Sequence, residues 1–388
     1  MPINKIITKE KSESNIKSSP NCFKNIKSAF FLRKLFDNLP KKKALEIARY
    51  NKDIQRRIEL GINDYKDSQL IEIELIPLER KDTDFFIHYK EEYEQYFHIF
   101  FDNNIKEAKR NYLLENEEVE NIKIIIDQPV TSFEGLFESC KYIKSINFKK
   151  FYRNNITNMS NMFSKCSLLE EINLNNFNTK NVTDMSYMFL SCSSLKEINL
   201  NNFNTNNVSD ISHMFNGCSS LKEIDLNSFN TFNVTDMDNM FTNCSSLERI
   251  NFANINTNNV IDMDGMFIGC KSLKEINLSN FNTDNLNNMG YMFSGCSSLK
   301  EINLANFNTN NVNNMRGLFN GCRLLERLNM ANFNTFNVTV MSQMFNECCS
   351  LKDIELSQLD MRNVKMADSM FSECSEEFIE KVLGMILL

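Results

Sequence analysis

Cysteine is the residue type in this sequence whose spacing most strongly suggests chemistry. Ten of the twelve cysteines recur at one constant interval, and only Cys22 and Cys349 fall outside this register. The regular set is Cys140, Cys166, Cys192, Cys218, Cys244, Cys270, Cys296, Cys322, Cys348 and Cys374. Because a thiolate is a nucleophile and a metal ligand, such a column would form a redox or metal ladder if its thiols were activated.

The surroundings of these cysteines favour packing over reactivity. Zinc sites use paired Cys-x-x-Cys spacings or mixed Cys and His clusters, whereas this sequence has only three histidines, His88, His98 and His213. Neither a histidine nor a basic position recurs beside the cysteines to lower their pKa. We therefore interpret the column as small buried hydrophobic side chains in a reducing compartment, with the redox or metal ladder as the alternative.

The elements that hold the cysteines belong to a repeated unit whose length equals the cysteine interval, N-V-x-x-M-x-x-M-F-x-x-C-x-x-L-x-x-I-x-L-x-x-F-x-T-x. In one copy, the apolar residues from Val182 to Cys192 have the spacing of a helical or 3₁₀ stripe. Ile198 and Leu200 have the period of two that is typical of a short strand. Asn and Thr fill the return turn. Each unit is therefore predicted to contain one helical segment, one short strand and one tight turn.

A single unit is too small to fold alone. Its apolar side chains contribute roughly 2 kcal/mol each when buried, which does not offset a cost of roughly 1–2 kcal/mol for ordering each residue. Stacked units would share strand hydrogen bonds and cover each other's flanks, as in a solenoid. With strands about 4.8 Å apart, the array would form a parallel sheet roughly 45 Å long. The expected fold class is an α/β repeat solenoid preceded by a small helical and α+β region.

The L-x-x-I-x-L portion that follows the stripe resembles a leucine-rich repeat. The whole unit resembles, in its apolar pattern and its length, the BspA-like surface-protein repeats that occur in bacteria and protists. The resemblance covers about residues 120–376. It implies a leucine-rich-repeat solenoid and, often, a role at the cell surface or in adhesion. This sequence departs from the family in lacking a visible export signal.

The chain divides into five predicted segments. Residues 1–25 are expected to be a disordered basic N-terminus, residues 26–69 short helices, and residues 70–128 an α+β cap on the array. Residues 129–376 are expected to form the solenoid of ten units. Residues 377–388 are expected to form a capping helix, preceded by a Ser-x-x-Glu-like cap.

Function in a solenoid is carried by the side chains that the repeat leaves free, which on the strand flank Ile198 and its counterparts. We predict that they form a polar, mildly acidic binding strip. Its members are Glu197, Asn199, Glu223, Asp225, Arg249, Asn251, Glu275, Asn277, Glu301, Asn303, Arg327 and Asn329. The alternative is a solvated face whose charges pair laterally, each pair contributing about 0.2–1 kcal/mol.

The return turn contributes two further candidates and one regular column. Phe232 and Phe336 replace a polar residue there, so that they either anchor a partner or lie on a neighbouring stem. Asn181 recurs unchanged in every later copy, which we interpret as a ladder of amides that satisfies backbone groups of the turns. Sequons such as Asn181-Val-Thr183 arise from the repeat itself.

Charge and hydropathy narrow the functional classes. The net charge is −7, although residues 1–50 contain 12 Lys and Arg against 4 Asp and Glu. Nucleic-acid binding by the whole chain is not expected, and a nucleic-acid or membrane-surface patch on the basic N-terminus is the alternative. We see neither a signal peptide nor a stretch of 18 apolar residues, so no membrane insertion is expected. The expected location is cytoplasmic, with the cell surface as the alternative.

These observations predict a monomeric, non-catalytic interaction scaffold without a metal or a cofactor, because no nucleophile and base pair, phosphate loop or metal cluster is evident. Its partner would be an unknown protein or a glycan. One alternative is an intracellular adaptor, since the stretch "SAFFLRKLFDNLPKKKALEIARYNKDIQRRIEL" resembles the helical pattern of an F-box, which recruits ubiquitin ligases. Another alternative is a cell-surface adhesin whose export signal is missing.

Overall fold

The computed structural model describes residues 26, 28–37, 39, 44, 47–48, 51–58, 70–80, 82–151, 153–354 and 359–386. The chain separates into two units, Met1–Ser68 and Gln69–Leu388. The expectation of a disordered N-terminus at residues 1–25 lies outside the described residues. None of the described helices is long and apolar enough to cross a membrane.

Among its described residues, the first unit has the short helices α1 (Ala29–Asp37) and α3 (Lys52–Arg57). Its small core consists of Leu32, Phe36, Ala44, Ala48 and Ile54. Asn51 begins α3 as an N-cap, because its side chain accepts a hydrogen bond from the backbone N–H of Ile54 at 3.1 Å.

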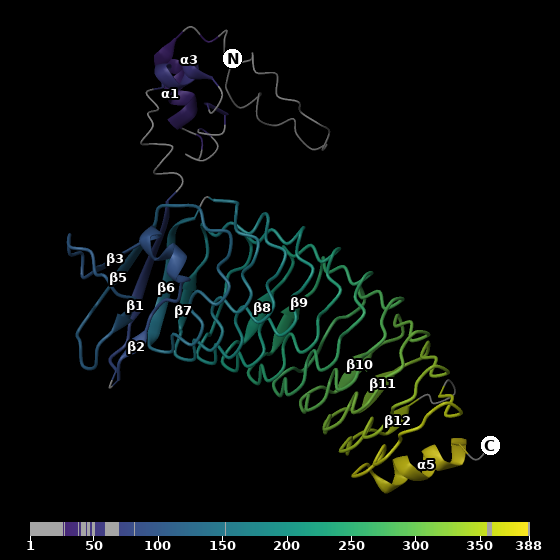
Figure 1. The fold of residues 1–388 in the computed structure, drawn as a ribbon. Coiled ribbons are helices and arrows are strands. Elements are labelled where there is room, and N and C mark those ends of the chain that lie inside the picture. Colours follow the sequence, from purple (N-terminus) through teal and green to yellow (C-terminus); the bar gives the residue numbers. More distant parts are fainter. Residues whose placement is uncertain are drawn as a thin grey trace. The chain divides into compact units, whose positions relative to one another are not determined.

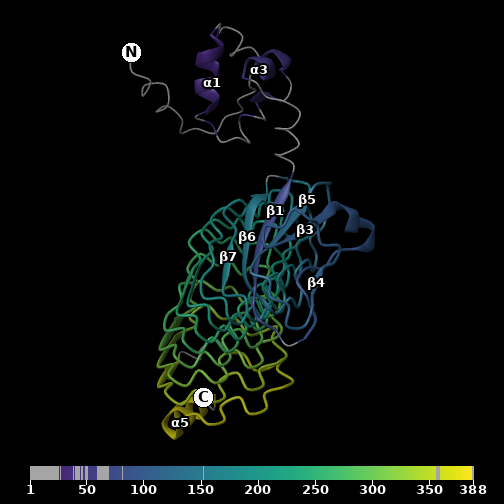
Figure 2. The same cartoon turned by 90° about the vertical axis from the view of Figure 1, so that its left-hand side faces the viewer.

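The second unit begins with a five-stranded sheet in the order β3-β5-β1-β6-β7 (Figure 2). These strands are β1 (Ile71–Pro77), β3 (Phe97–Phe101), β5 (Ile122–Ile126), β6 (Ile143–Phe151) and β7 (Glu171–Asn173). A 3₁₀ helix, η2 (Glu91–Tyr96), precedes β3, and β2 (Asp84–Phe85) pairs with β4 (Tyr112–Leu113). Because β6 is antiparallel to β1 and parallel to β7, this cap sheet continues directly into the repeats.

The repeats form a curved array of stacked coils, each coil being one repeat unit of the chain (Figure 1). Parallel bridges join the same position of successive coils, from Ser132↔Asn158 to Val340↔Met366. Later strands are β8 (Glu223–Asp225), β9 (Arg249–Asn251), β10 (Glu301–Asn303), β11 (Arg327–Asn329) and β12 (Asp353–Ile354). Helix α5 (Glu376–Ile386) covers the last coil, where the ring of Phe378 lies edge-on to that of Phe371 at 6.1 Å.

The helical segment expected in each repeat is not a helix. It is a row of turns in which every fourth residue has a positive φ, as at Tyr187 (58°) and Ser191 (56°). Half of its N–H groups donate within a turn, as Cys192 does to the carbonyl of Phe189 at 3.1 Å. The alternate N–H groups donate to the next coil, as Phe189 does to Met214 at 2.9 Å. The apolar spacing alone resembles a helix, but the hydrogen bonds between coils select turns.

The expected continuous parallel sheet is also interrupted. β8 pairs with β9, and β10, β11 and β12 form a second group, whereas residues 197–199 and 275–277 are not strands. Strand pairing is present where Arg249 lies opposite Glu223 and where Arg327 lies opposite Glu301. Glu197 precedes both groups and lies between Glu171 and Glu223 in its column, whereas Glu275, which lies between the groups, has Arg249 and Glu301 as its column neighbours. Like charges opposite one another weaken strand pairing, which gives a physical reason for the interruption at Glu197.

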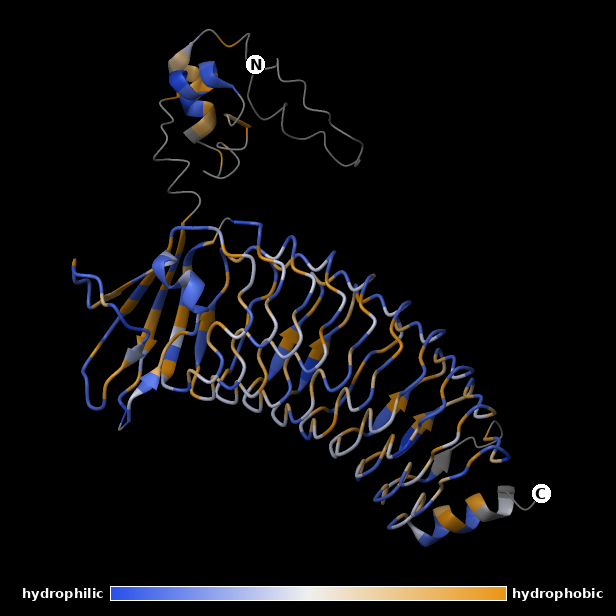
Figure 3. Cartoon of the chain, in the orientation of Figure 1, coloured by the Kyte–Doolittle hydropathy of each residue, from blue (hydrophilic) through white to orange (hydrophobic). Residues whose placement is uncertain are grey.

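The core is built from columns of similar apolar side chains. Apolar residues recur at matching places of successive coils (Figure 3). The phenylalanines three residues before the cysteines stack in one ladder from Phe137 to Phe371, with successive ring centroids 5.2–5.8 Å apart. Methionine and leucine columns line the same interior. Since every coil buries its rings against the coils before and after it, the stability of the array depends on stacking.

A column of buried threonines links the return turns: Thr179, Thr205, Thr231, Thr257, Thr283, Thr309 and Thr335. The hydroxyl of Thr257 donates to the carbonyl of Asn282 at 2.7 Å and accepts from the N–H of the same residue at 2.8 Å. One hydroxyl thus satisfies both backbone groups of a residue in the next coil.

We therefore expect Thr257→Val to lower the free energy of unfolding by about 1–3 kcal/mol, although valine has a similar shape. Valine would leave the partly buried N–H and carbonyl of Asn282 without their partner. Urea denaturation followed by circular dichroism measures the change. Thr257→Ser, which keeps the hydroxyl, should lose much less, and an equal loss in both variants would assign the effect to packing of the methyl group.

The interpretation of Asn181 and its counterparts as a ladder is confirmed. Each amide nitrogen donates to the backbone carbonyl 27 residues earlier, at 2.6–2.9 Å. The series comprises Asn181, Asn207, Asn233, Asn259, Asn285, Asn311, Asn337 and Asn363. These amides therefore hold neighbouring turns together.

Candidate functional site

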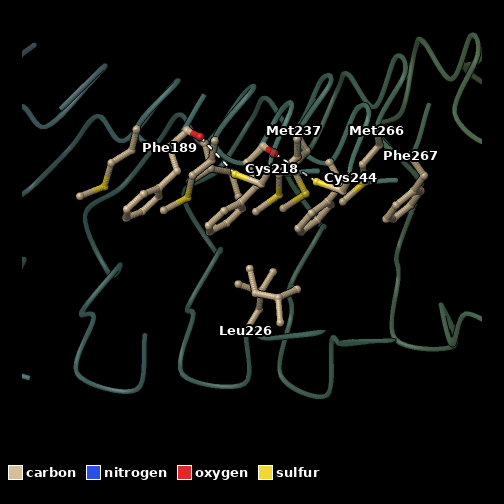
Figure 4. Close-up of a cluster of buried hydrophobic side chains, with 14 of the residues drawn as sticks. Phe189, Cys218, Leu226, Met237, Cys244, Met266 and Phe267 are labelled. Atoms are coloured by element: carbon tan, nitrogen blue, oxygen red, sulfur yellow. Dashed lines mark hydrogen bonds between the residues drawn. The ribbon is translucent and has the colours of Figure 1, made fainter. Parts of the chain in front are cut away.

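The regular cysteines are buried, apart from the partly exposed Cys374 at the end of the array, and no disulfide joins them. The thiol of Cys244 donates to the backbone carbonyl of Phe215 at 3.1 Å, and that of Cys218 donates to Phe189 at 3.1 Å (Figure 4). The same contact, with the carbonyl 29 residues earlier, is made by every regular cysteine from Cys166 onward. This confirms the packing interpretation and adds a hydrogen bond that the sequence did not indicate.

Burial also makes these thiols poor nucleophiles. Removal from water raises the pKa of Cys218 and that of Cys296 to about 12. Burial, and after it the neighbouring Cys218, raises the pKa of Cys244 well above its usual value. Because the thiolate is the reactive form, the column is unreactive at neutral pH.

A groove of about 2350 Å³ runs along the strand side of the array in the second unit. It is lined by residues on the strand side of successive coils, between Ser145 and Ala331, and by Lys381 of α5. All twelve members of the predicted polar strip, from Glu197 to Asn329, line this groove. The two columns are brought together because alternate side chains of a strand point to the same face.

The charges in the groove are only partly neutralised. Arg249 forms an ion pair with Glu223 at 3.1 Å, and Arg327 forms one with Glu301 at 2.6 Å. Both pairs run along the column between coils, as does the flanking pair of Lys196 with Glu170 at 3.4 Å. All of them are exposed, so each contributes about 0.2–1 kcal/mol to stability.

The asparagine column of the groove also has a structural role. The side-chain oxygen of Asn199 accepts a hydrogen bond from the N–H of Asn201 at 3.0 Å, and Asn277 accepts one from Ser279 at 3.0 Å. The same contact is made by Asp225, Asn251, Asn303 and Asn329. These side chains therefore begin the turn after the strand. The amide nitrogens of Asn199 and Asn277 are left to face the groove, whereas that of Asn251 donates to the carboxylate of Asp225 at 2.8 Å.

The two predicted aromatic anchors lie elsewhere. Phe232 and Phe336 are 54% and 50% exposed on the return turns and do not line the groove. The guanidinium of Arg362 lies over the ring of Phe336, 5.9 Å from its centroid. The structure therefore separates the predicted surface into a polar groove and two aromatic side chains on another edge, because the return turn follows the strand after a change of direction.

A titratable cluster on the turn row was missed by the sequence reasoning. His213 stacks on Tyr187 with ring centroids 4.5 Å apart, and its Nε2 lies 3.2 Å from a carboxylate oxygen of Asp238. Asp236 lies in the same coil as Asp238, and Asp264 lies in the coil that follows. The recurring aspartates at 184, 210, 236 and 262 were the available signal. Among the described residues, no group of three His, Cys, Asp or Glu side chains could hold a metal ion.

Asp264→Asn is expected to stabilise the protein at neutral pH but not at pH 4. Burial, and then repulsion by Asp262 and Asp238, raises the pKa of Asp264 from 3.8 to about 6. A carboxyl with a raised folded-state pKa contributes stability below its unfolded pKa and loses it as pH rises through its folded pKa.

The gain from Asp264→Asn should therefore be near zero at pH 4 and reach about 1 kcal/mol at pH 7, reduced by solvent screening because the group is only half-buried. Urea denaturation of both proteins at about pH 4, pH 5.5 and pH 7, which bracket the folded-state pKa, tests this. Asp284→Asn, on the exposed return turn, is the control. A gain that does not change with pH would contradict the assignment.

Comparison with known families supports the repeat organisation. Residues 131–252, 221–303, 239–329 and 296–382 match the family model described as "Mycoplasma protein of unknown function, DUF285". The chain belongs to the DUF285 family. The DUF285 matches overlap along most of the array, as expected for a unit that recurs in one register.

No curated protein matches the chain. A crystal structure of a leucine-rich repeat protein from Eubacterium ventriosum is 15% identical, and the match covers 63% of this chain and 80% of that one. Its TM-score of 0.31 is too low to carry an argument. The matched model is that of DUF285 rather than that of the BspA-like repeats.

Proposed function

We propose that this DUF285 protein is a non-catalytic protein-interaction scaffold, built as a leucine-rich-repeat solenoid of the BspA-like kind. The observation that carries the proposal is the groove of about 2350 Å³, whose lining combines charged and amide side chains over successive coils. Residues such as Glu197 and Glu275 are exposed and contribute nothing to the core, so their presence in the repeat is not explained by folding.

The chemistry of the groove supports binding rather than catalysis. Its lining contains carboxylates, guanidinium groups and amides, but no cysteine or histidine. The thiols of the array are buried and have raised pKa values. A partner would gain affinity from many weak contacts spread along the groove. Specific protein–protein interfaces typically bury about 800 Å² of surface on each partner. We take the partner to be a protein, with a glycan as the alternative that the sequence left open.

Site-specific photo-crosslinking tests the proposal. A benzoylphenylalanine residue replaces Asn303 in the groove, and matched controls carry it at Phe232 on the return turn and at Glu118 in the cap. We expect a discrete protein adduct from position 303 that disappears when Asn251→Arg and Asn277→Arg block the two preceding coils. The same adducts from all three positions, or none from position 303, would contradict a binding groove.

A second candidate, an adaptor, is favoured by α1. Phe31 and Leu35 are 51% and 39% exposed on this short helix, an arrangement that suits docking to another protein. Capture of ubiquitin-ligase subunits by the full chain, but not by a Phe31→Ser, Leu35→Ser variant, would support this function. Capture by neither protein would remove it.

A further inference from the structure

Main-chain hydrogen bonds along the groove join some successive coils and are missing between others. The N–H of Glu248 donates to the carbonyl of Lys222 at 2.8 Å, and three coils later the N–H of Glu326 donates to Lys300 at 2.8 Å. Over the part of the chain that the structure describes, residues 197–199 and 275–277 make no main-chain bond to a neighbouring coil. These two rows therefore present unpaired backbone groups between hydrogen-bonded strand pairs.

The charges follow the same pattern. Arg249 neutralises Glu223, and Arg327 neutralises Glu301, again three coils apart. Glu197 and Glu275 occupy the intervening rows, and neither forms an ion pair with a described residue. The two rows without main-chain partners are thus also rows whose carboxylates lack a cation.

Each of these rows is rich in hydrogen-bond acceptors. Besides the carboxylate, the carbonyls of residues 197–199 and 275–277 have no partner within the described residues. The amide nitrogens of Asn199 and Asn277 add donors, since their oxygens are already bonded to the following turn. An ammonium or guanidinium group, which has several N–H donors and a positive charge, fits an exposed carboxylate that has no cation of its own.

We infer that these two rows are subsites for two cationic side chains of a single extended peptide segment of a partner protein. This rests on the proposed function and specifies what the groove binds. Three coils separate the subsites, which corresponds to about 14 Å at a strand spacing of about 4.8 Å. An extended chain rises about 3.4 Å per residue, so residues i and i+4 are about 14 Å apart and point to the same side.

The bound segment therefore carries Lys or Arg at positions i and i+4. Its intervening residue i+2 lies over the pair of Glu223 and Arg249, which is already neutral. A segment with cations at i and i+3 would point one of them away from the groove, because side chains alternate along an extended chain. The spacing of the subsites thus selects among peptides of equal charge.

Fluorescence anisotropy with the full chain tests this inference. One labelled peptide carries lysines at i and i+4 in a threonine- and serine-rich host, and a matched peptide of the same composition carries them at i and i+3. We expect the first peptide to bind about tenfold more tightly, because both cations are engaged at once. Glu197→Gln and Glu275→Gln should each reduce its affinity to that of the second peptide.

The control variant Glu118→Gln, Glu134→Gln removes the same charge from exposed positions outside the groove and should leave the preference unchanged. Equal affinity for the two peptides, with binding still dependent on Glu197 and Glu275, would overturn the paired subsites and leave the binding groove in place. Binding that no groove substitution changes would overturn the inference, and photo-crosslinking decides the proposed function separately. Tighter binding of spermine than of either peptide would overturn the assignment to a peptide.

Discussion

Cys244→Asp is expected to unfold the central array, lowering the free energy of unfolding by at least about 4 kcal/mol, whereas Cys244→Ala should lower it by about 1–2 kcal/mol. The side chain of Cys244 is fully buried between aromatic and aliphatic columns. A carboxylate there would have no counter-charge and would have to be buried either ionised or protonated at neutral pH. Alanine would leave only a small cavity and would leave the carbonyl of Phe215 without its thiol donor.

Urea denaturation followed by circular dichroism measures both variants. Cys349→Asp is the matched control, because this neighbouring cysteine is exposed and lies outside the register. It should change stability by less than about 0.5 kcal/mol. If Cys244→Asp and Cys244→Ala were tolerated equally, the cysteine column would not be buried and the stacking of the coils would have to be different.

A second large effect is expected at an exchange of two core residues in one coil. Phe252 occupies a position where the neighbouring coils have Leu226 and Leu278, and Ile255 occupies one where they have phenylalanine. Both side chains are buried, and the ring of Phe252 packs edge-on against Phe281 at 5.2 Å. The larger and the smaller residue have thus changed places within the same layer, which keeps its volume.

Single substitutions toward the common pattern should therefore destabilise the protein. Ile255→Phe would overpack the layer at a cost of about 1–3 kcal/mol, and Phe252→Leu would leave a cavity at a cost of about 1–2 kcal/mol. The double variant should recover most of the loss, with a coupling energy of about 1–3 kcal/mol in a double-mutant cycle. Additive losses would mean that the two residues do not fill a shared space.

Much of the fold could be predicted from the sequence because the repeat has no insertions. The fixed interval between Cys140 and Cys374 predicted the stacking, the burial of the cysteines and the position of the open strand face. The asparagine ladder was predicted because Asn181 and its counterparts occupy one turn position. The prediction of a helix was wrong, because an apolar spacing of three is also satisfied by a row of turns with residues such as Tyr187 in a left-handed conformation.

The candidate site was predicted in part. The alternation around Ile198 placed Glu197 and Asn199 on the same face, and both line the groove. Phe232 could not be placed relative to that face, because its position depends on how the chain turns after the strand. The cluster of His213 with Asp238 was missed because its members lie in successive coils, and only stacking brings them within 3.2 Å.

The amino-acid pattern alone gives the repeat length, the membership of the core columns and the residues that remain exposed, because these properties are local to one unit. Contacts between coils decide the conformation of the turn row, the hydrogen bond of each thiol and the interruption of the sheet at Glu197 and Glu275. Backbone groups and charges of one coil find their partners only in the next coil. For that reason the stacked structure distinguishes neutral rows of the groove from rows that are open to a cation.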